Sequence, residues 1–200
     1  MADMYIRKAV LETLAIRELK KYNMGVLLNG QPCAVPIEDL IEQQYGLTVE
    51  YHYLRKGFTV LGQMVFENCY VPIYDMERRE YTVVEATDGT MFIDLRLLQP
   101  KMANRLRFTK GHELGHYLVH RELFRNLGQS AAMINQVYTH DATERQADEL
   151  CAAILMPKGQ LKRAFYNSKT HDERAVNELA VLFGVAPKTM KIQLTQFGLI

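Results

Sequence analysis

The sequence is poor in the residues that mark several protein classes. It contains 3 cysteines and no tryptophan among 200 residues. The cysteines, Cys33, Cys69 and Cys151, are odd in number, lie far apart and include no Cys-x-x-Cys pair. This pattern argues against a disulfide framework and against a thiolate zinc cluster. Because a secreted chain would more often pair its cysteines, we expect a cytoplasmic protein.

Long apolar runs are also missing. No segment approaches the roughly 20 consecutive apolar residues that a membrane-spanning helix needs, so we expect no membrane partner. Charges interrupt residues 1–22 every few positions, and the segment therefore lacks the apolar centre of a secretion signal. With 48% hydrophobic and 24% charged residues, the composition is that of a folded globular chain and excludes disorder, collagen and coiled coils.

An excess of one charge sign is missing as well. The net charge is +1, with 10 basic against 14 acidic residues in positions 1–100 and 14 against 9 in positions 101–200. A solvated surface explains this small asymmetry better than a nucleic-acid groove, which normally combines basic clusters with aromatic residues. Direct binding of nucleic acid is therefore not expected.

The order of patterns along the chain predicts an α+β fold. A helical pattern over 3–22 precedes a short helix over 36–45, which begins at Pro36 and is closed by Gly46. Segments rich in β-branched and aromatic residues predict a small, mostly antiparallel sheet with strands at 47–54, 59–66, 69–75, 81–85 and 90–95. The later helices are expected at 104–127, 143–156, 158–166, 172–183 and 187–197.

The strongest functional signal is His112-Glu113-Leu114-Gly115-His116. Residues four apart on a helix lie one above the other, so both imidazoles can reach one divalent metal ion. Glu113 lies beside them, where it can take a proton from a metal-bound water. The alternative is an ordinary helix with two surface histidines, but the many apolar residues of this segment make it a core element. Gly115 predicts a close backbone approach, because glycine costs a helix about 1 kcal/mol relative to alanine.

Two histidines and a water leave a tetrahedral site incomplete. The helix expected after Asp141 carries Glu144 and Asp148, four residues apart at the edge of an apolar stripe. Carboxylates on a core-facing stripe are costly unless they are paired or bound to a cation. We therefore predict Glu144 as the third ligand and Asp148 as the group that orients a ligand histidine. A capping-box pair with Asp141 is the alternative role of Glu144.

Other polar residues near the motif have more than one interpretation. His120 and His140 compete with Glu144 as ligands, although His120 is better explained as a buried structural histidine or a pocket wall. Tyr138 and His140 are candidates for the donor that stabilises a transition-state oxyanion, and equally for ordinary loop residues. The strand at 90–95 could bind an extended peptide by strand addition if it forms the sheet edge.

These residues together resemble the ImmA/IrrE family of zincin-like metallopeptidases. Arg107-Phe108-Thr109 is similar to the family's lead-in to the motif, and Glu144-x-x-Ala147-Asp148 is similar to its third-ligand helix. The resemblance implies one Zn²⁺ per chain, with Mn²⁺ as the alternative metal, and an endopeptidase with Glu113 as the catalytic base. It also implies a protein substrate in the cytoplasm, a helix-turn-helix repressor of a mobile element or a stress response.

We divide the chain into a zincin-like metallopeptidase domain, residues 1–157, and a C-terminal helical subdomain, residues 158–200. Ala180 and Gly184 are spaced as in a helix-turn-helix. Residues 172–200 contain 3 basic and 3 acidic residues, however, which is unfavourable for phosphate contacts. Packing or repressor docking is therefore favoured over DNA readout. The alternative for the whole chain is a non-catalytic regulatory protein that binds a repressor or DNA through these helices.

Overall fold

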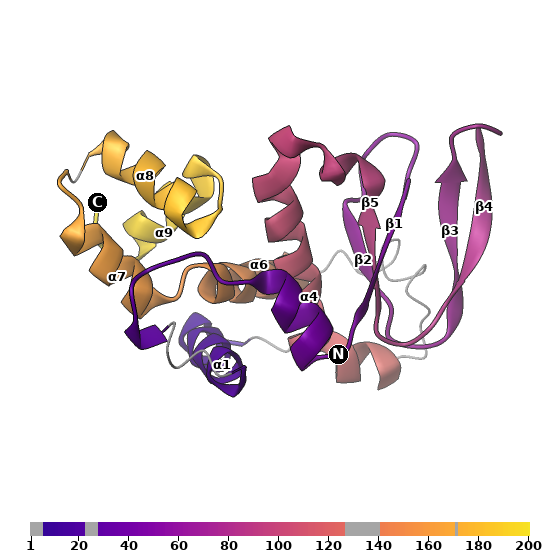
Figure 1. Ribbon diagram of the computed structural model, residues 1–200. Helices are drawn as coiled ribbons and strands as arrows, with labels where there is room; N and C mark the ends of the chain where they lie inside the picture. The colour runs from indigo at the N-terminus through magenta and orange to yellow at the C-terminus, as the bar shows by residue number, and fades with distance from the viewer. Residues whose placement is uncertain (1–5, 23–27, 127–140, 171) are drawn as a thin grey trace.

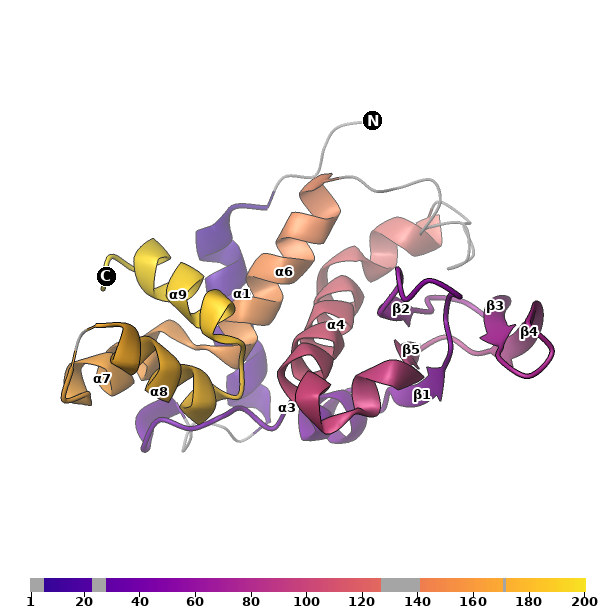
Figure 2. The same ribbon diagram turned by 90° about the horizontal axis from the view of Figure 1, so that it is seen from above.

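The structure is a computed structural model that describes residues 6–22, 28–126, 141–170 and 172–200. Its strands lie on one side of the molecule and most of its helices on the other, with α4 (Ala103–Asn126) between them (Figure 1). The view from above shows the same order, with α6 (Asp141–Leu155) on the side of α4 that faces away from the strands (Figure 2). Helix α4 is therefore the element on which both halves of the molecule pack.

The element bounds agree with the predicted α+β order. The other helices are α1 (Lys8–Lys21), α3 (Ile37–Asp39), α7 (Lys158–Asn167), α8 (Glu173–Phe183) and α9 (Pro187–Gln196). The strands are β1 (Thr48–His52), β2 (Gly62–Met64), β3 (Cys69–Asp75), β4 (Glu80–Ala86) and β5 (Thr90–Asp94). A π-helical turn, Leu40–Gln44, extends α3, and two 3-10 turns, Leu95–Leu98 and Pro100–Met102, connect β5 to α4. The sequence did not indicate these 3-10 turns.

The strands form two sheets. One has the order β1-β5-β2, with β1 parallel and β2 antiparallel to β5, and the other is the antiparallel hairpin of β3 and β4. Antiparallel pairs predominate, as predicted, but the strands form two sheets where the sequence predicted one. The expectation that strand 90–95 could form the sheet edge is wrong. All five residues of β5 are buried, which is typical of a central strand covered on both faces.

Helices α4 and α6 approach each other closely at Gly115. A Cβ atom on Gly115 would lie 2.9 Å from the backbone oxygen of Ala147, which confirms the close approach predicted from this glycine. One turn earlier, a Cβ atom on Gly111 would lie 2.7 Å from the sulfur of Cys151. The two glycines thus allow α6 to pack on α4 at short range, and this packing brings the acidic side chains of α6 close to the histidines of α4.

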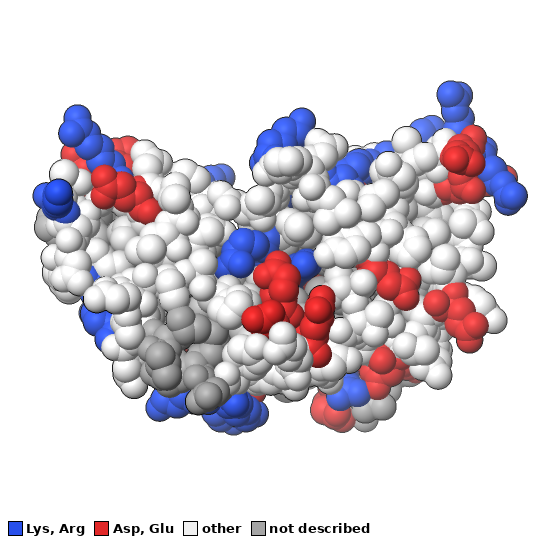
Figure 3. All heavy atoms as spheres, in the orientation of Figure 1, with Lys and Arg blue, Asp and Glu red and all other residues white. Residues whose placement is uncertain are grey.

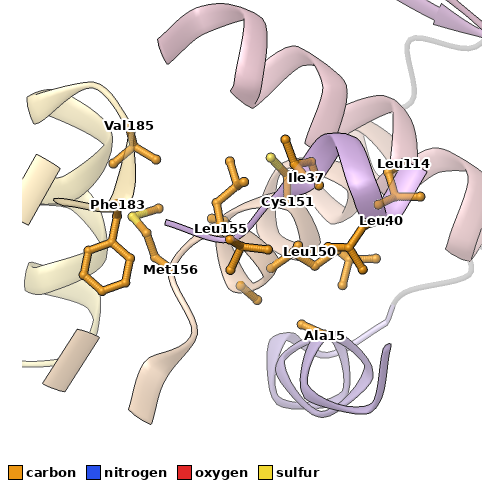
Figure 4. Close-up of a cluster of buried hydrophobic side chains, with 14 of the residues drawn as sticks. Ala15, Ile37, Leu40, Leu114, Leu150, Cys151, Leu155, Met156, Phe183 and Val185 are labelled. Atoms are coloured by element: carbon orange, nitrogen blue, oxygen red, sulfur yellow. The ribbon is translucent and has the colours of Figure 1, made fainter. Parts of the chain in front are cut away.

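A single hydrophobic cluster connects α1 and α6 with the C-terminal helices. In Figure 4, Leu155 and Met156 of the α6 segment lie between Ala15 of α1 and the pair Phe183 and Val185. Side chains from both sides of residue 157 share this core. The subdomain boundary placed at residue 157 therefore does not separate two hydrophobic cores, and it stays a prediction. Among the described residues, none of the helices has the length and apolar character that crossing a membrane requires.

The start of α4 is also bound to the turn between α8 and α9. The Arg107 guanidinium donates to the backbone oxygens of Gly184 (3.2 Å) and Val35 (2.8 Å). The side-chain amide of Asn104 donates to the oxygen of Val185 at 3.2 Å. Gly184 has a φ of 64°, a left-handed conformation that favours glycine and ends α8. This turn is thereby fixed to the helix that carries the predicted motif.

Candidate metal centre

Three side chains of α4 and α6 converge on one point. The Nε2 atoms of His112 and His116 lie 2.9 Å apart. The carboxylate of Glu144 lies 3.2 Å from Nε2 of His112 and 3.3 Å from Nε2 of His116. Among the described residues, this is a group of potential ligands whose donor atoms all lie within 4.8 Å of one another.

The donor set fits a zinc ion. Zinc in proteins binds imidazole nitrogens and carboxylate oxygens at about 2.0–2.2 Å in tetrahedral geometry, which separates two ligand atoms by roughly 3.3 Å. The distances observed between the three donor groups, from 2.9 to 3.3 Å, are close to this value. One carboxylate and two imidazoles also leave one tetrahedral position for water or substrate, as catalytic zinc sites do.

His112 is held by a second carboxylate. Its Nδ1–H donates to Oδ1 of Asp148 at 2.8 Å, which leaves Nε2 directed at the centre. Burial would lower the pKa of His112, but the hydrogen bonds from His112 to Asp148 and Glu144 outweigh burial and raise this pKa to about 10. Hydrogen bonds from His112 and His116 to Glu144 hold the pKa of the Glu144 carboxyl well below its usual range. Asp148 therefore lies where the sequence predicted an orienting group.

His116 is held by a third histidine. Its Nδ1 lies 3.1 Å from Nδ1 of His120, and Nε2 of His120 lies 3.1 Å from Oε1 of Gln146. His120 is fully buried, as predicted for a structural histidine. Burial, followed by the charge of His116, lowers the pKa of His120 to about 4. His120 thus contacts a candidate ligand from behind and does not point at the centre itself.

Glu113 lies between α4 and β2, and only 6% of it is exposed. Its carboxylate accepts a hydrogen bond from the backbone N–H of Met64. Burial raises its pKa, which makes the carboxylate a stronger base near neutral pH. A Cβ atom on Gly62 would lie 2.5 Å from Oε1 of Glu113 and 2.8 Å from Cγ2 of Thr109. Glu113 can therefore occupy this position because residue 62 has no side chain.

A cleft of about 340 Å³ contains these groups. One wall is formed by residues 59–64 and Phe66, and the other by Phe108, Thr109 and the candidate metal ligands. Strand β2 is the edge of its sheet that faces this cleft. The arrangement combines a candidate metal centre, a buried base and an adjacent strand in one cavity, which is the set of parts that hydrolysis of an extended peptide needs.

The structure brings together five of the predicted residues, namely His112, Glu113, His116, Glu144 and Asp148. Their roles stay predictions. The expectation that the two carboxylates lie on a core-facing stripe is wrong, because the side chains of Glu144 and Asp148 are 51% and 57% exposed at the rim of the cleft. The contacts of Glu144 with both histidines favour the ligand role over a helix cap. Tyr138 and His140 lie outside the described residues, so their candidate roles also stay predictions.

Two residues of the site were missed by the sequence analysis. A glycine inside a strand often marks a close approach of another group, so Gly62 could have been noticed. Gln146 carried no signal, because glutamine is common on helices and its partner His120 is 26 residues away. The spacing of four residues between His116 and His120 was visible, but it did not reveal which nitrogen atoms meet.

Comparison with known proteins gives a family and a fold. The IrrE N-terminal-like domain, peptidase family M78, matches residues 84–195, which is more than half of the chain and includes both helices of the candidate metal centre. A solved structure of a Mycobacterium tuberculosis transcriptional regulator is similar with a TM-score of 0.51 and 16% identity. The similarity covers 96% of this chain but 57% of that structure, and at this identity it shows the fold alone. Comparison with curated proteins finds no match. The chain belongs to the IrrE N-terminal-like family of M78 peptidases.

Proposed function

We propose that this chain is a zinc-dependent endopeptidase that hydrolyses peptide bonds in a cytoplasmic protein. The observation that carries the proposal is the convergence of His112, His116 and Glu144 on one point of a cleft. Glu113, the predicted base, is buried in the wall of the same cleft. Membership of a peptidase family supports the same activity.

The residues of the cleft would divide the work of hydrolysis. His112, His116 and Glu144 would hold the zinc ion, which when bound supplies a Lewis acid that polarises a carbonyl and lowers the pKa of water. Glu113 would accept a proton from the attacking water and return it to the leaving amine. Its burial supports this role, because a raised pKa allows the carboxyl to keep the proton between the two steps. Asp148 would keep the His112 ring in place.

The substrate would lie along β2. Residues 59–64 line the cleft, and β2 is the sheet edge beside the candidate centre. An extended peptide that adds to this edge would pass over the three candidate ligands. We therefore expect a peptide to add to β2 and not to β5, which is central in its sheet.

A helix-turn-helix repressor of a mobile element or a stress response is the proposed substrate. The resemblance to the ImmA/IrrE family supports it. Direct DNA binding by α8 and α9 is not part of the proposal, because residues 172–200 contain 3 basic and 3 acidic side chains. On the face drawn in Figure 3, basic and acidic side chains of the described residues are interspersed in small groups.

The test combines zinc loading with a change of the base. Glu113→Gln should keep one zinc per chain, because Glu113 is not a predicted ligand, and should lose at least ~10²-fold in cleavage rate. Glu122→Gln, an exposed glutamate on the same helix, is the control and should cleave like the parent. Cleavage would be followed by mass spectrometry on unstructured polypeptides and on repressors encoded beside the gene.

Two results would contradict the proposal. Full activity of Glu113→Gln would exclude Glu113 as the base. A zinc-loaded parent that binds a repressor tightly without cleaving it would favour the alternative, a non-catalytic regulatory protein.

A further inference from the structure

We infer that His120 and Gln146 form a relay that fixes the hydrogen positions of His116 and so prepares its Nε2 atom for a metal ion. Both are positioning residues, since neither contacts the centre. The inference rests on the proposed metal-binding role of His116. It adds that metal binding also depends on His120 and Gln146, which are not ligands themselves.

The relay begins at Gln146, whose Oε1 atom is a carbonyl oxygen and can only accept a hydrogen bond. Nε2 of His120 lies 3.1 Å from this oxygen and must therefore carry a hydrogen. The other ring nitrogen of His120, Nδ1, lies 3.1 Å from Nδ1 of His116. At this distance one hydrogen lies between the two nitrogen atoms, and it belongs to one of them.

The proposed role of His116 decides which nitrogen carries that hydrogen. A histidine binds a metal ion through a ring nitrogen that carries no hydrogen. Nε2 of His116 faces the centre, 2.9 Å from Nε2 of His112 and 3.3 Å from Glu144, so in the metal-bound site the hydrogen of this ring lies on Nδ1. His116 then donates it to Nδ1 of His120, which accepts it because the hydrogen of His120 lies on Nε2, opposite Gln146.

Helix α6 thus supplies a partner for each histidine of the centre. Asp148 accepts from His112 directly, and Gln146 acts on His116 through His120. Glu144 of the same helix supplies the third donor. In metal sites, partners that bind the far nitrogen of a ligand histidine fix its tautomer and ring orientation, and their loss typically costs 10–100-fold in metal affinity.

The test compares changes at two buried glutamines. Gln146→Met removes the acceptor with little change in size and should weaken zinc binding by ~10–100-fold. Gln146→Glu keeps an acceptor at the same place and should restore binding to within about threefold of the parent, since a carboxylate accepts from imidazole equally well. Gln160→Met is the matched control, because Gln160 on α7 is as deeply buried but lies outside the cleft. Its zinc affinity should equal that of the parent. Each dissociation constant would be measured by competition with a chromophoric chelator.

A second readout follows the hydrogens directly. In nitrogen-15 spectra of the zinc-loaded parent, the imidazole of His120 should carry its hydrogen on Nε2 and that of His116 on Nδ1. A hydrogen on Nδ1 of His120 would overturn the relay, and this result decides the matter if Gln146→Met does not fold.

The outcomes separate the relay from the proposed function. Equal zinc affinity of the parent and a folded Gln146→Met would overturn the relay and leave the proposed function intact. A parent chain that binds no zinc would contradict the proposed function, and the relay with it.

Discussion

Glu113 occupies space that is available because residue 62 has no side chain. A single methyl group added at residue 62 should therefore change the rate of cleavage. In Gly62→Ala the new Cβ would lie 2.5 Å from Oε1 of Glu113, so the carboxylate must move. A misplacement of about 1 Å can cost ~10²-fold in rate. We expect cleavage to fall by ~10–100-fold while the zinc content stays unchanged, measured by steady-state kinetics and metal analysis.

The control for this prediction is Gly159→Ala. Nothing lies within 4 Å of a Cβ at Gly159, which is on α7. This change should leave cleavage unaffected and stabilise the helix by about 0.5–1 kcal/mol. Equal activity of Gly62→Ala and the parent would contradict the proposed position of Glu113 during catalysis.

The pKa of His112 predicts how the stability of the metal-free chain depends on pH. Burial lowers this pKa, but Asp148 and Glu144 raise it to about 10, from about 6.5 in the unfolded chain. A raised pKa stabilises the folded state fully below pH 6.5, and this stabilisation is lost as the pH rises towards 10. In Asp148→Asn the loss of unfolding free energy between these pH values should be smaller.

Urea denaturation with a chelator present, at pH 6.5 and at pH 9.5, would measure this difference. Glu149→Gln is the control, because Glu149 is the neighbouring residue and has no contact with His112 among the described interactions. An unchanged pH dependence in Asp148→Asn would exclude the pairing of Asp148 with His112 in solution.

At the scale of single residues, the sequence predicted the convergence of His112 and His116 because helix geometry fixes it. It predicted Glu144 and Asp148 with an incorrect burial argument, since both carboxylates remain half exposed. Gly62 and Gln146 were missed because their importance depends on neighbours that only the fold brings into contact.

At the scale of elements, the packing of α4 on α6 determines whether the site assembles. In Gly115→Ala the new Cβ would lie 2.9 Å from the backbone oxygen of Ala147, so the two helices must separate. We expect a loss of about 1–3 kcal/mol in unfolding free energy. Zinc affinity should fall as well, because Glu144 moves away from the histidines.

Gly111→Ala is the comparison for this change. Its Cβ would meet the sulfur of Cys151, a side-chain atom, which can rotate away more easily than backbone can move. Its effect on zinc affinity should therefore be smaller than that of Gly115→Ala. Equal zinc affinity of Gly115→Ala and the parent would contradict the role assigned to this close approach.

Element positions were largely predictable, because each depends on local patterns. Pro36 and Gly46 frame the short helix, and apolar periodicity locates α4 and α6. The pairing of strands was not predictable, since β1 and β5 are far apart in sequence and meet as a parallel pair. Strand β5 lies between β1 and β2, and all five of its residues are buried. Its sequence was also compatible with a sheet edge.

At the scale of the whole molecule, the candidate metal centre lies where the two halves meet. Helix α4 packs between the strands and α6, and the shared core continues into the turn between α8 and α9 (Figures 1 and 4). Arg107 binds this turn from the helix that carries His112 and His116. The C-terminal helices therefore pack against the helix that carries these histidines, and their balanced charge favours such packing over phosphate contacts.

The most direct test of the proposed metal centre is the zinc content of the purified chain beside that of Glu144→Gln, measured by elemental analysis after equilibration with zinc and removal of the excess. We expect about one zinc per parent chain and clearly less in the variant, because Glu144 supplies one of three donors. A parent chain without zinc, or a variant that holds as much zinc as the parent, would contradict the assignment of His112, His116 and Glu144 as a metal centre.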